Sequence, residues 1–530
     1  MKVTLQNLKT AFSDGVQPAI DAAVEDAIDL YKSDDKPWVI GYSGGKDSTA
    51  ILQLVWTAIS KIDKAERTKP VHVISTDTLV ENPIVAQWVG HSLDVMKKSA
   101  EEQQLPIIPH KLTPIIEDSF WVNLIGRGYP APRHKFRWCT SRIKINPSNH
   151  FITNIVQEHG EAILVLGTRK AESASRSKTM SNKETNKYHK TRIRDKISPN
   201  ASLPNALVYT PIETWSNDDV WLYLMQFKNP WGYNNKDLLA MYSGATDGGE
   251  CPLVVDTSTP SCGDSRFGCW VCTLVDQDKS MAAMVQNDQE KEWMLPLLKF
   301  RNKLDFRTGE RGETLEKKEN DRHLRDFRRM SGNTQVFMGR LIHGPYTQSA
   351  REDFLAELLK AQEHVRKKGP PEVRDIELIT MNELEEIRRV WVIEKHEIED
   401  SLPRIYKKAT GRDLPLPALD ENLPFGEEEI TTLRETCGKD SLQYELIRDC
   451  IDIERRYSTM LRRAGLFGEL ESAIQRNFYT DEQDAEEMAL RRSEAKKGEQ
   501  EEFDDYYDRF KSGNASPIKD TSENGKDADQ

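Results

Sequence analysis

Gly41-Tyr42-Ser43-Gly44-Gly45-Lys46-Asp47-Ser48 stands between an apolar run, Trp38-Val39-Ile40, and a stretch with helical spacing from Ser48 to Ile62. Adjacent glycines let backbone N–H groups approach a ligand, and a helix that follows directly presents the positive end of its dipole. Lys46 adds a mobile cation. The loop is not of the Walker A type, because no Gly-Lys-Ser/Thr follows a four-residue gap. The sequence therefore predicts a strand–loop–helix site for the pyrophosphate of a nucleotide.

The same alternation of apolar runs and helical spacing continues along the chain. Strands are predicted at 71–75, 107–109 and 163–167, and a helix with proline at its start is predicted over 83–104. Strands that alternate with helices at this spacing indicate βαβ units, hence an α/β fold with a parallel sheet flanked by helices. From about residue 280 helical spacing dominates. We expect an N-terminal helical segment over 1–36, a nucleotide-binding domain over 37–280, a helical extension over 281–484 and a disordered acidic tail over 485–530.

Composition excludes several classes of protein. The 530 residues carry a net charge of −12, which argues against a free-standing DNA-binding protein with strong phosphate affinity. Basic patches occur at 133–137, 183–196 and 322–329, and solvated surface is the simplest interpretation of each. No run of about 18 apolar residues occurs, and the first residues lack an apolar core, so we expect a cytoplasmic protein without membrane contact.

Further polar residues follow the predicted strands. Asp77 comes after the second strand, where a carboxylate is placed to bind Mg²⁺ or a ribose. Gly167-Thr168-Arg169 follows a later strand, with Arg176 beyond it, and two guanidinium groups at one edge of the sheet could clamp an anion. The stretch near Ser216 is interpreted as a capped helix with core tryptophans.

The cysteines are few but clustered. Cys269-Trp270-Val271-Cys272 is a CxxC pair, and Cys262 lies seven residues earlier. Three close thiols in an intracellular chain with few cysteines indicate a metal. Spacing alone leaves an iron–sulfur cluster, zinc and a redox dithiol open.

The run Ser-Gly-Gly-Lys-Asp-Ser resembles the PP-loop of ATP pyrophosphatases. Together with Gly-x-Arg-x-x-Glu-Ser-x-x-Arg and Pro-Ile-x-x-Trp-x-x-Asp-Asp-Val-Trp, it is similar to the phosphoadenosine phosphosulfate (PAPS) reductase group over roughly residues 35–275. This resemblance implies the adenine nucleotide alpha-hydrolase-like fold, Mg²⁺, and cleavage of ATP between its α- and β-phosphates. The ATP-binding residues that it implies are Ser43, Gly44, Gly45, Lys46, Asp47, Ser48, Asp77 and Gly167.

Within this group, the layout resembles the DndC family, the sulfurtransferase subunit of bacterial DNA phosphorothioation systems. Iron–sulfur reductases of the group carry a tandem Cys-Cys where this chain has Cys139 alone. The resemblance implies a [4Fe–4S] cluster, with DNA, a cysteine desulfurase and other modification subunits as partners. The cluster ligands that it implies are Cys139, Cys262, Cys269 and Cys272. The catalytic residues expected are Lys46, Asp47, Asp77, Arg169, Arg176 and Cys251, the last as a sulfur carrier or an alternative ligand.

Three other functions remain open at this point. A PAPS reductase would release sulfite from a small sulfonucleotide, but its C-terminal Glu-Cys-Gly motif is matched only partly, at Cys437. A tRNA thiolase would share the adenylation step. A scaffold that binds ATP to assemble a DNA-modifying complex would release no pyrophosphate.

Overall fold

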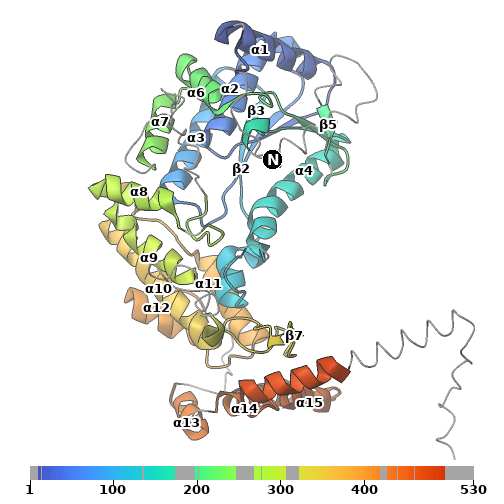
Figure 1. Ribbon diagram of the computed structural model, residues 1–530, viewed down its shortest axis with the longest axis vertical. Helices are drawn as coiled ribbons and strands as arrows, with labels where there is room; N and C mark the ends of the chain where they lie inside the picture. Colours follow the sequence, from blue (N-terminus) through green and yellow to red (C-terminus); the bar gives the residue numbers. More distant parts are fainter. Residues whose placement is uncertain are drawn as a thin grey trace, which may run out of the picture. The chain divides into compact units, whose positions relative to one another are not determined.

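The computed structural model describes residues 10–13, 15–133, 136–172, 197–200, 202–245, 268–275, 277–305, 321–417, 427–438, 440–458 and 460–495. Figure 1 shows the chain, which divides into two compact units that are described separately. Unit 1 comprises residues 1–320, 351–390 and 401–417, and unit 2 comprises residues 321–350, 391–400 and 418–530. The predicted site residues Arg176, Cys251 and Cys262 lie outside the described residues, as does the basic patch at 183–196.

Unit 1 contains a six-stranded sheet that is parallel except for β5, which confirms the predicted α/β class. In order across the sheet, the strands are β3 (Ile107–Leu112), β2 (Val71–Thr76), β1 (Trp38–Gly41), β4 (Ala162–Val165), β6 (Ala206–Tyr209) and β5 (Ile197–Pro199). The chain leaves β1 toward β2 on one side and later returns to β4 on the other side. A crevice for ligands opens beyond the carboxyl ends of the strands at such a switch point. The Gly-rich loop after β1 lies there.

Helices cover both faces of this sheet. The side chains of Trp38 and Ile40 pack on one face with α1 (Val16–Lys32), α2 (Lys46–Lys61) and the helices next to them. Val39 between them packs on the opposite face against α4 (Asn146–His159), as the alternation of a strand requires. Figure 1 shows α4 across the sheet from α2 and α3. The other helices on the first face are α3 (Pro83–Glu102), α6 (Asn217–Gln226) and α7 (Asn235–Gly244).

The rest of unit 1 is helical. Its helices are α8 (Lys279–Asn287), α9 (Leu295–Leu304), α10 (Gln348–Lys368), α11 (Met381–Arg389) and α12 (Leu402–Thr410). Trp121, from the loop region after β3, packs in its core against Trp270 and Phe300, with ring centroids 5.8 Å away in each case. The indole of Trp121 donates a hydrogen bond to the carbonyl of Leu378 at 2.7 Å. This core therefore ties the CxxC segment to the helices that follow it.

Unit 2 holds the hairpin β7 (Val336–Phe337) and β8 (Arg340–Leu341), with α13 (Glu427–Cys437), α14 (Ser441–Ser458) and α15 (Leu466–Arg476). Residues 482–495 are also helical, and Ala485 and Ala489 are buried. The disordered tail expected from residue 485 therefore does not start there, because two small side chains in this stretch pack inward. Residues 496–530 lie outside the described part of the chain.

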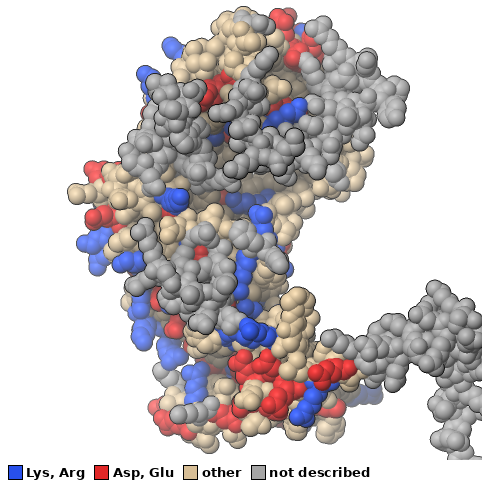
Figure 2. All heavy atoms as spheres, in the orientation of Figure 1, with Lys and Arg blue, Asp and Glu red and all other residues tan. Residues whose placement is uncertain are grey.

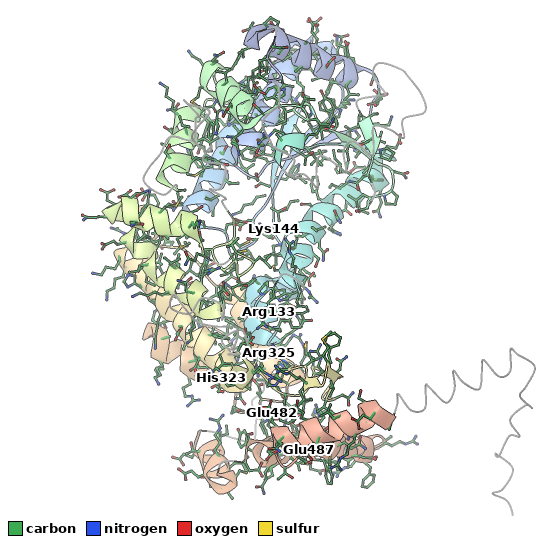
Figure 3. The ribbon with its side chains drawn as sticks, viewed as in Figure 1. Arg133, Lys144, His323, Arg325, Glu482 and Glu487 are labelled. Carbon is green, nitrogen blue, oxygen red and sulfur yellow. The ribbon has the colours of Figure 1, made fainter. Side chains whose placement is uncertain are left out.

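Arginines of the third basic patch, residues 322–329, donate hydrogen bonds to backbone carbonyls within unit 2. Arg322 donates to the carbonyl of Leu341 at 3.1 Å, and Arg325, labelled in Figure 3, donates to that of Gly344 at 2.9 Å. These arginines satisfy backbone acceptors in a segment that has little regular structure. Across the described residues, no helix has the length and apolar character that a membrane crossing requires.

Candidate functional site

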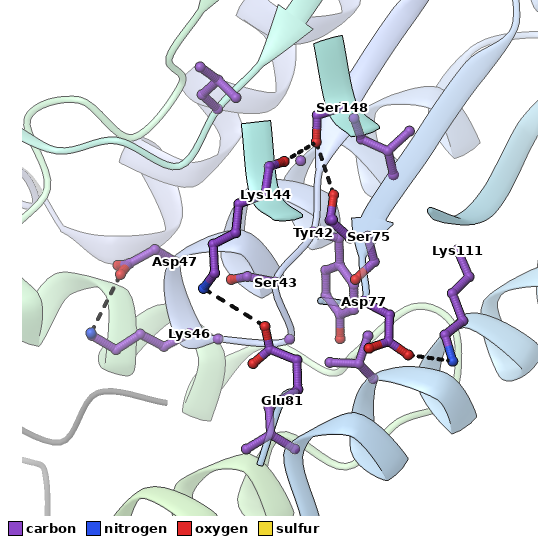
Figure 4. A pocket seen from close by; sticks show the side chains of 18 of the residues that line it. Tyr42, Ser43, Lys46, Asp47, Ser75, Asp77, Glu81, Lys111, Lys144 and Ser148 are labelled. Atoms are coloured by element: carbon purple, nitrogen blue, oxygen red, sulfur yellow. Dashed lines mark hydrogen bonds and ion pairs between the residues drawn. The ribbon is translucent and has the colours of Figure 1, made fainter. Parts of the chain in front are cut away.

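A cavity of about 960 Å³ opens at the carboxyl ends of β1, β2 and β4. Figure 4 shows it from close by, with side chains from the Gly-rich loop on one wall. Loop residues 41–47 line it together with residues 74–77 after β2 and residues of α3 and α4. A cavity of this size is within the range of small-molecule sites, so it accommodates a nucleotide.

The Gly-rich loop is held in shape by its own side chains and by glycine. Gly44 has a φ of +72°, and a Cβ built on it would lie 2.5 Å from Cγ2 of Val89. The Ser48 hydroxyl donates to the carbonyl of Gly45 at 3.0 Å and lies 3.2 Å from the hydroxyl of Ser43. Helix α2 begins at Lys46, so its first N–H groups and its dipole face the cavity. The predicted residues Ser43 to Asp47 line the cavity, whereas Ser48 supports the loop from behind.

Charged side chains of both signs line the cavity. The ammonium of Lys46 lies 3.4 Å from the carboxylate of Asp47. Around the wall, the ammonium of Lys111 lies 2.8 Å from the carboxylate of Asp77. Asp77 thus follows β2 at the edge of the cavity, as predicted, and its other oxygen accepts from the N–H of Leu79 at 2.8 Å. Lysines beside carboxylates suit a polyphosphate that arrives with Mg²⁺, because Mg²⁺ takes oxygen ligands from carboxylates and phosphates.

Arg169 lines the cavity, although its side chain is almost fully buried. Its Nε donates to Oδ1 of Asp47 at 2.8 Å, and its Nη1 donates to the carbonyl of Trp215 at 3.3 Å. A Cβ built on Gly167 would lie 3.1 Å from the carbonyl oxygen of Asp47. Arg169 therefore positions Asp47, and Gly167 allows the loop after β4 to pack against the start of α2. The second predicted arginine, Arg176, lies outside the described residues.

Tyr242, which the sequence analysis missed, forms part of this wall. It comes from α7 and accepts a hydrogen bond from the N–H of Lys46 at 3.4 Å, while the Lys46 ammonium lies 5.5 Å from its ring centroid. Burial raises the pKa of Tyr242 to about 12, so its hydroxyl is protonated at neutral pH. No local motif marks this residue, because its contact with the loop is made across the fold.

The CxxC segment lies against the same cavity. Cys269 forms an antiparallel bridge with Glu81, which lines the cavity. The Cys269 sulfur is 3.9 Å from a carboxylate oxygen of Glu81 and 3.4 Å from the hydroxyl of Thr78. Lys144, whose ammonium lies 3.8 Å from the same carboxylate, also lines the cavity. The structure therefore places the predicted thiol segment behind Glu81 and Lys144, which line the cavity of the predicted nucleotide loop, while neither Cys269 nor Cys272 lines it.

Hydrogen bonds fix the CxxC turn in place. The N–H of Cys272 donates to the carbonyl of Cys269 at 3.1 Å. The fully buried Arg301 donates to the carbonyl of Cys272 at 3.0 Å, and Thr273 donates to that of Pro132 at 2.7 Å. These bonds satisfy buried backbone carbonyls, so the turn is pre-organised by its surroundings.

Cys139 completes the described part of the predicted thiol set. It precedes a π-helical turn, Thr140–Ile145, that leads into α4. Burial raises the pKa of the Cys139 thiol and the neighbouring Cys272 adds to the rise, while burial raises the pKa of Cys269 to about 12. Among the described residues, no three histidine, cysteine, aspartate or glutamate side chains stand as a metal-binding group. Cys139, Cys269 and Cys272 therefore do not form a metal-binding group in the described structure, and both candidates for the fourth ligand lie outside the described residues.

A parallel α/β sheet with a Gly-rich loop at its switch point and a charged cavity beyond it defines a nucleotide-binding domain of the PP-loop type. Residues 37–234 match the family model of the phosphoadenosine phosphosulfate reductase domain. The chain thus contains a PAPS reductase-like domain of the adenine nucleotide alpha-hydrolase type, a type of enzyme that binds ATP.

Two individual proteins are similar to parts of the chain. An uncharacterized protein of Methanocaldococcus jannaschii is 29% identical over 203 residues, which are 38% of this chain and 34% of that relative. The match thus spans about a third of the length of the curated relative. The crystal structure of the PAPS reductase from Candida auris, a phosphate complex, is 16% identical with a TM-score of 0.24 and covers 43% of this chain and 93% of that chain.

Proposed function

We propose that the protein is an ATP pyrophosphatase and sulfurtransferase that modifies DNA. It adenylates a phosphate of the DNA backbone so that sulfur replaces a non-bridging oxygen, as in bacterial DNA phosphorothioation. A cysteine desulfurase supplies the sulfur, and other modification subunits act with this chain. The family match over residues 37–234 supports the ATP chemistry. The choice of DNA rests on the resemblance of the whole layout to the DndC family.

One observation carries the proposal: the thiol segment packs directly against Glu81, a residue that lines the cavity of the nucleotide loop. Glu81 lines the cavity and lies 3.9 Å from the sulfur of Cys269, while Lys46 lines it from the loop. An enzyme that activates a phosphate with ATP and then transfers sulfur needs both groups within reach of one substrate atom.

The chemistry balances in two displacements. A non-bridging oxygen of the DNA phosphate attacks the α-phosphorus of ATP, and pyrophosphate leaves with the electron pair of the broken P–O bond. Lys46 and the first N–H groups of α2 stabilise the charge that builds on pyrophosphate. Asp77 is the residue that would hold Mg²⁺, which would supply further positive charge to the leaving group. A hydrosulfide equivalent then attacks the DNA phosphorus. AMP leaves with the former phosphate oxygen, and the proton of the hydrosulfide goes to solvent. These two displacements transfer no electrons, but the desulfurase delivers sulfur as a persulfide, so a dithiol reductant must first supply two electrons to release it as hydrosulfide.

The residues that would hold a [4Fe–4S] cluster are Cys139, Cys269 and Cys272, with Cys262 or Cys251 as the fourth. When bound, the cluster would supply a soft-metal site for a sulfur anion beside the phosphate. Lys144 and Glu81 line the cavity next to this thiol segment.

Pyrophosphate and AMP release from ATP, measured with DNA and a sulfide source, tests the ATP step. Lys46→Ala removes the loop cation and is expected to reduce pyrophosphate release at least about 100-fold, the usual size of losing one group that stabilises transition-state charge. Lys61→Ala, at the exposed far end of the same helix, is the matched control. Equal release from both variants would remove the loop from the chemistry. Sulfur incorporation is read by mass spectrometry of the digested DNA.

Iron and acid-labile sulfide in anaerobically purified protein test the cluster. Cys269→Ser is expected to lose most of both, while Cys450→Ser in α14 serves as the matched cysteine control. Full iron in Cys269→Ser, or stoichiometric zinc in the wild-type protein, would defeat the iron–sulfur assignment. Pyrophosphate release is measured on the same samples, so the ATP step and the cluster are judged separately.

The second candidate is a PAPS reductase, which the family match favours. It would release sulfite from a sulfonucleotide with thioredoxin as reductant, and it would need no DNA. Cys437, the partial match to the reductase nucleophile, is buried at the end of α13 in unit 2. Thioredoxin-dependent sulfite release without pyrophosphate release would select the reductase over the sulfurtransferase.

A further inference from the structure

The basic segment that precedes Cys139 forms a short turn on the surface of unit 1. Arg133 and Phe136 exchange two backbone hydrogen bonds, of 3.1 and 2.8 Å, which close the turn. Phe136 is 45% exposed, and Arg137 beside it is exposed and makes no ion pair with a described residue. Close to half of the Phe136 side chain thus remains in contact with solvent beside basic residues, where its ring is accessible to a ligand.

A second aromatic ring stands next to this turn. The ring centroid of Tyr129 is 6.5 Å from that of Phe136, and the guanidinium carbon of Arg142 lies 5.4 Å from the Tyr129 ring centroid. Arg142 is itself fixed by an ion pair of 2.7 Å to Asp118. We name Tyr129, Arg133, Phe136, Arg137 and Arg142 the arginine–aromatic surface.

Packing and hydrogen bonds hold this surface in place. Trp138, which follows it, is buried, stacks on Phe120 with centroids 5.3 Å apart, and donates to the carbonyl of Pro130 at 3.0 Å. The carbonyl of Pro132 accepts from Thr273, next to the CxxC pair. The surface therefore keeps a fixed position relative to the thiol segment.

The surface also leads toward the cavity. From Arg137 the chain runs through Cys139 and the π-helical turn to Lys144, which lines the cavity. Figure 3 labels Arg133 and Lys144 along this path, and Figure 2 shows blue Lys and Arg atoms following it on the same face. Basic side chains thus follow the chain from the aromatic rings to the cavity wall, with Arg137 exposed and with Arg142 and Lys144 paired to Asp118 and Glu81.

We propose that the arginine–aromatic surface binds single-stranded DNA and leads its backbone to the cavity. Aromatic side chains stack on base faces, which a duplex hides, while arginines follow the phosphates. Phe136 and Tyr129 stack on bases, and Arg133 and Arg137 pair with the backbone. This inference rests on the proposed function, since it takes the acceptor phosphate to belong to DNA.

Fluorescence anisotropy with labelled oligothymidine and the full chain tests the surface, at several salt concentrations. Phe136→Ala is expected to weaken binding about tenfold with an unchanged salt dependence, because it removes stacking but no charge. Arg137→Ala is expected to lower the slope of log affinity against log salt by ~0.7, the value for one phosphate contact on a single strand. Neither residue lines the cavity, so ATP affinity should stay at the wild-type value in both variants.

Two variants serve as matched controls. Phe467→Ala removes a phenylalanine that is 83% exposed on α15, and Lys98→Ala removes a lysine that is 80% exposed on α3. If all four variants bind DNA with the wild-type affinity, the arginine–aromatic surface is not the DNA-binding site, and the proposed function is unaffected. Absence of wild-type DNA binding, with pyrophosphate release intact, would instead remove DNA as the substrate. Tighter binding of oligouridine through the same residues would overturn the assignment to DNA.

Discussion

Arg169 donates from Nε to Oδ1 of Asp47 at 2.8 Å, which joins the loop after β4 to the first turn of α2. The two residues are distant in sequence, and the guanidinium is buried while the carboxylate reaches the cavity. A planar guanidinium can serve Asp47 and the carbonyl of Trp215 at once, which an ammonium on a flexible stem does poorly. The ion pair therefore sets the position of a residue in the nucleotide loop.

Arg169→Ala is expected to lower the free energy of unfolding by about 2–4 kcal/mol, because it leaves a partly buried carboxylate without its partner. Arg169→Lys should recover part of this loss. The measurement is urea denaturation of Arg169→Ala, Asp47→Ala and the double variant. The loss of unfolding free energy in the double variant should differ from the sum of the two single losses by more than about 1 kcal/mol, since the two groups are in contact. Single losses that add within about 0.5 kcal/mol would show that the contact does not stabilise the protein.

Gly44→Ala is expected to weaken ATP binding and lower the melting temperature. Its φ of +72° costs an alanine about 1–2 kcal/mol, and the new Cβ would lie 2.5 Å from the Val89 side chain. Gly160→Ala is the matched control, because Gly160 has a φ of +82° but nothing within 4 Å of a built Cβ. The melting temperature should therefore fall further in Gly44→Ala than in Gly160→Ala. Adding Val89→Ala to Gly44→Ala should remove this difference. Equal falls in melting temperature would show that the loop accommodates the new Cβ at no cost in stability.

The sequence predicted those parts of the fold that local patterns determine. The runs that became β1 to β4 are apolar and bounded by turn residues, and the loop before α2 has a distinctive glycine pattern. The later strands β5 and β6 escaped prediction, because β5 has only three residues and the two interior positions of β6 are only half-buried. Pairing with β4 establishes β6, and pairing with β6 establishes β5, so tertiary contacts decide both strands.

Local sequence patterns likewise predicted only part of the candidate site. The spacing of Cys269 and Cys272 indicates a thiol pair, but its bridge to Glu81 depends on the whole fold. Arg169 was expected to hold an anion, and its partners Asp47 and the Trp215 carbonyl could not be read from a charge pattern. A run of charges shows that cations are present, whereas the groups that neutralise them come from elsewhere in the chain.

Ser216→Ala is expected to destabilise the protein by about 1 kcal/mol, because Ser216 caps α6. Its hydroxyl accepts from the N–H of Asp219 at 3.1 Å, and the Asp219 carboxylate accepts from the N–H of Ser216 at 2.8 Å. Asp219 also accepts from the hydroxyl of Thr10 at 2.5 Å. Thermal unfolding measures the loss, with the exposed Ser202→Ala as control. Equal melting temperatures for the two variants would contradict the capping role.

Acid is expected to destabilise the fold through two histidines on the α4 face of the sheet. Nδ1 of His72 lies 3.0 Å from Nε2 of His110, and both rings pack against Phe151. Burial, with a further contribution from the charges of His110 and His159, lowers the pKa of His72 to about 4. Burial also lowers the pKa of His110. Protonation of this pair is therefore easier in the unfolded chain than in the folded protein.

The direction of the pH effect follows from these pKa values. Above about pH 6.5 the histidines are neutral in both states and contribute nothing, whereas between about pH 6.5 and 4 the unfolded chain binds a proton that folded His72 does not. Stability should fall as the pH falls through this window, by up to about 1.4 kcal/mol per pH unit for His72, and the lowered pKa of His110 acts in the same direction. His72→Phe should flatten the profile, while the exposed His91→Phe should leave it unchanged. Urea denaturation at pH 7.5, 6 and 5 distinguishes the two results, and equal slopes in wild type and His72→Phe would exclude His72 as the cause.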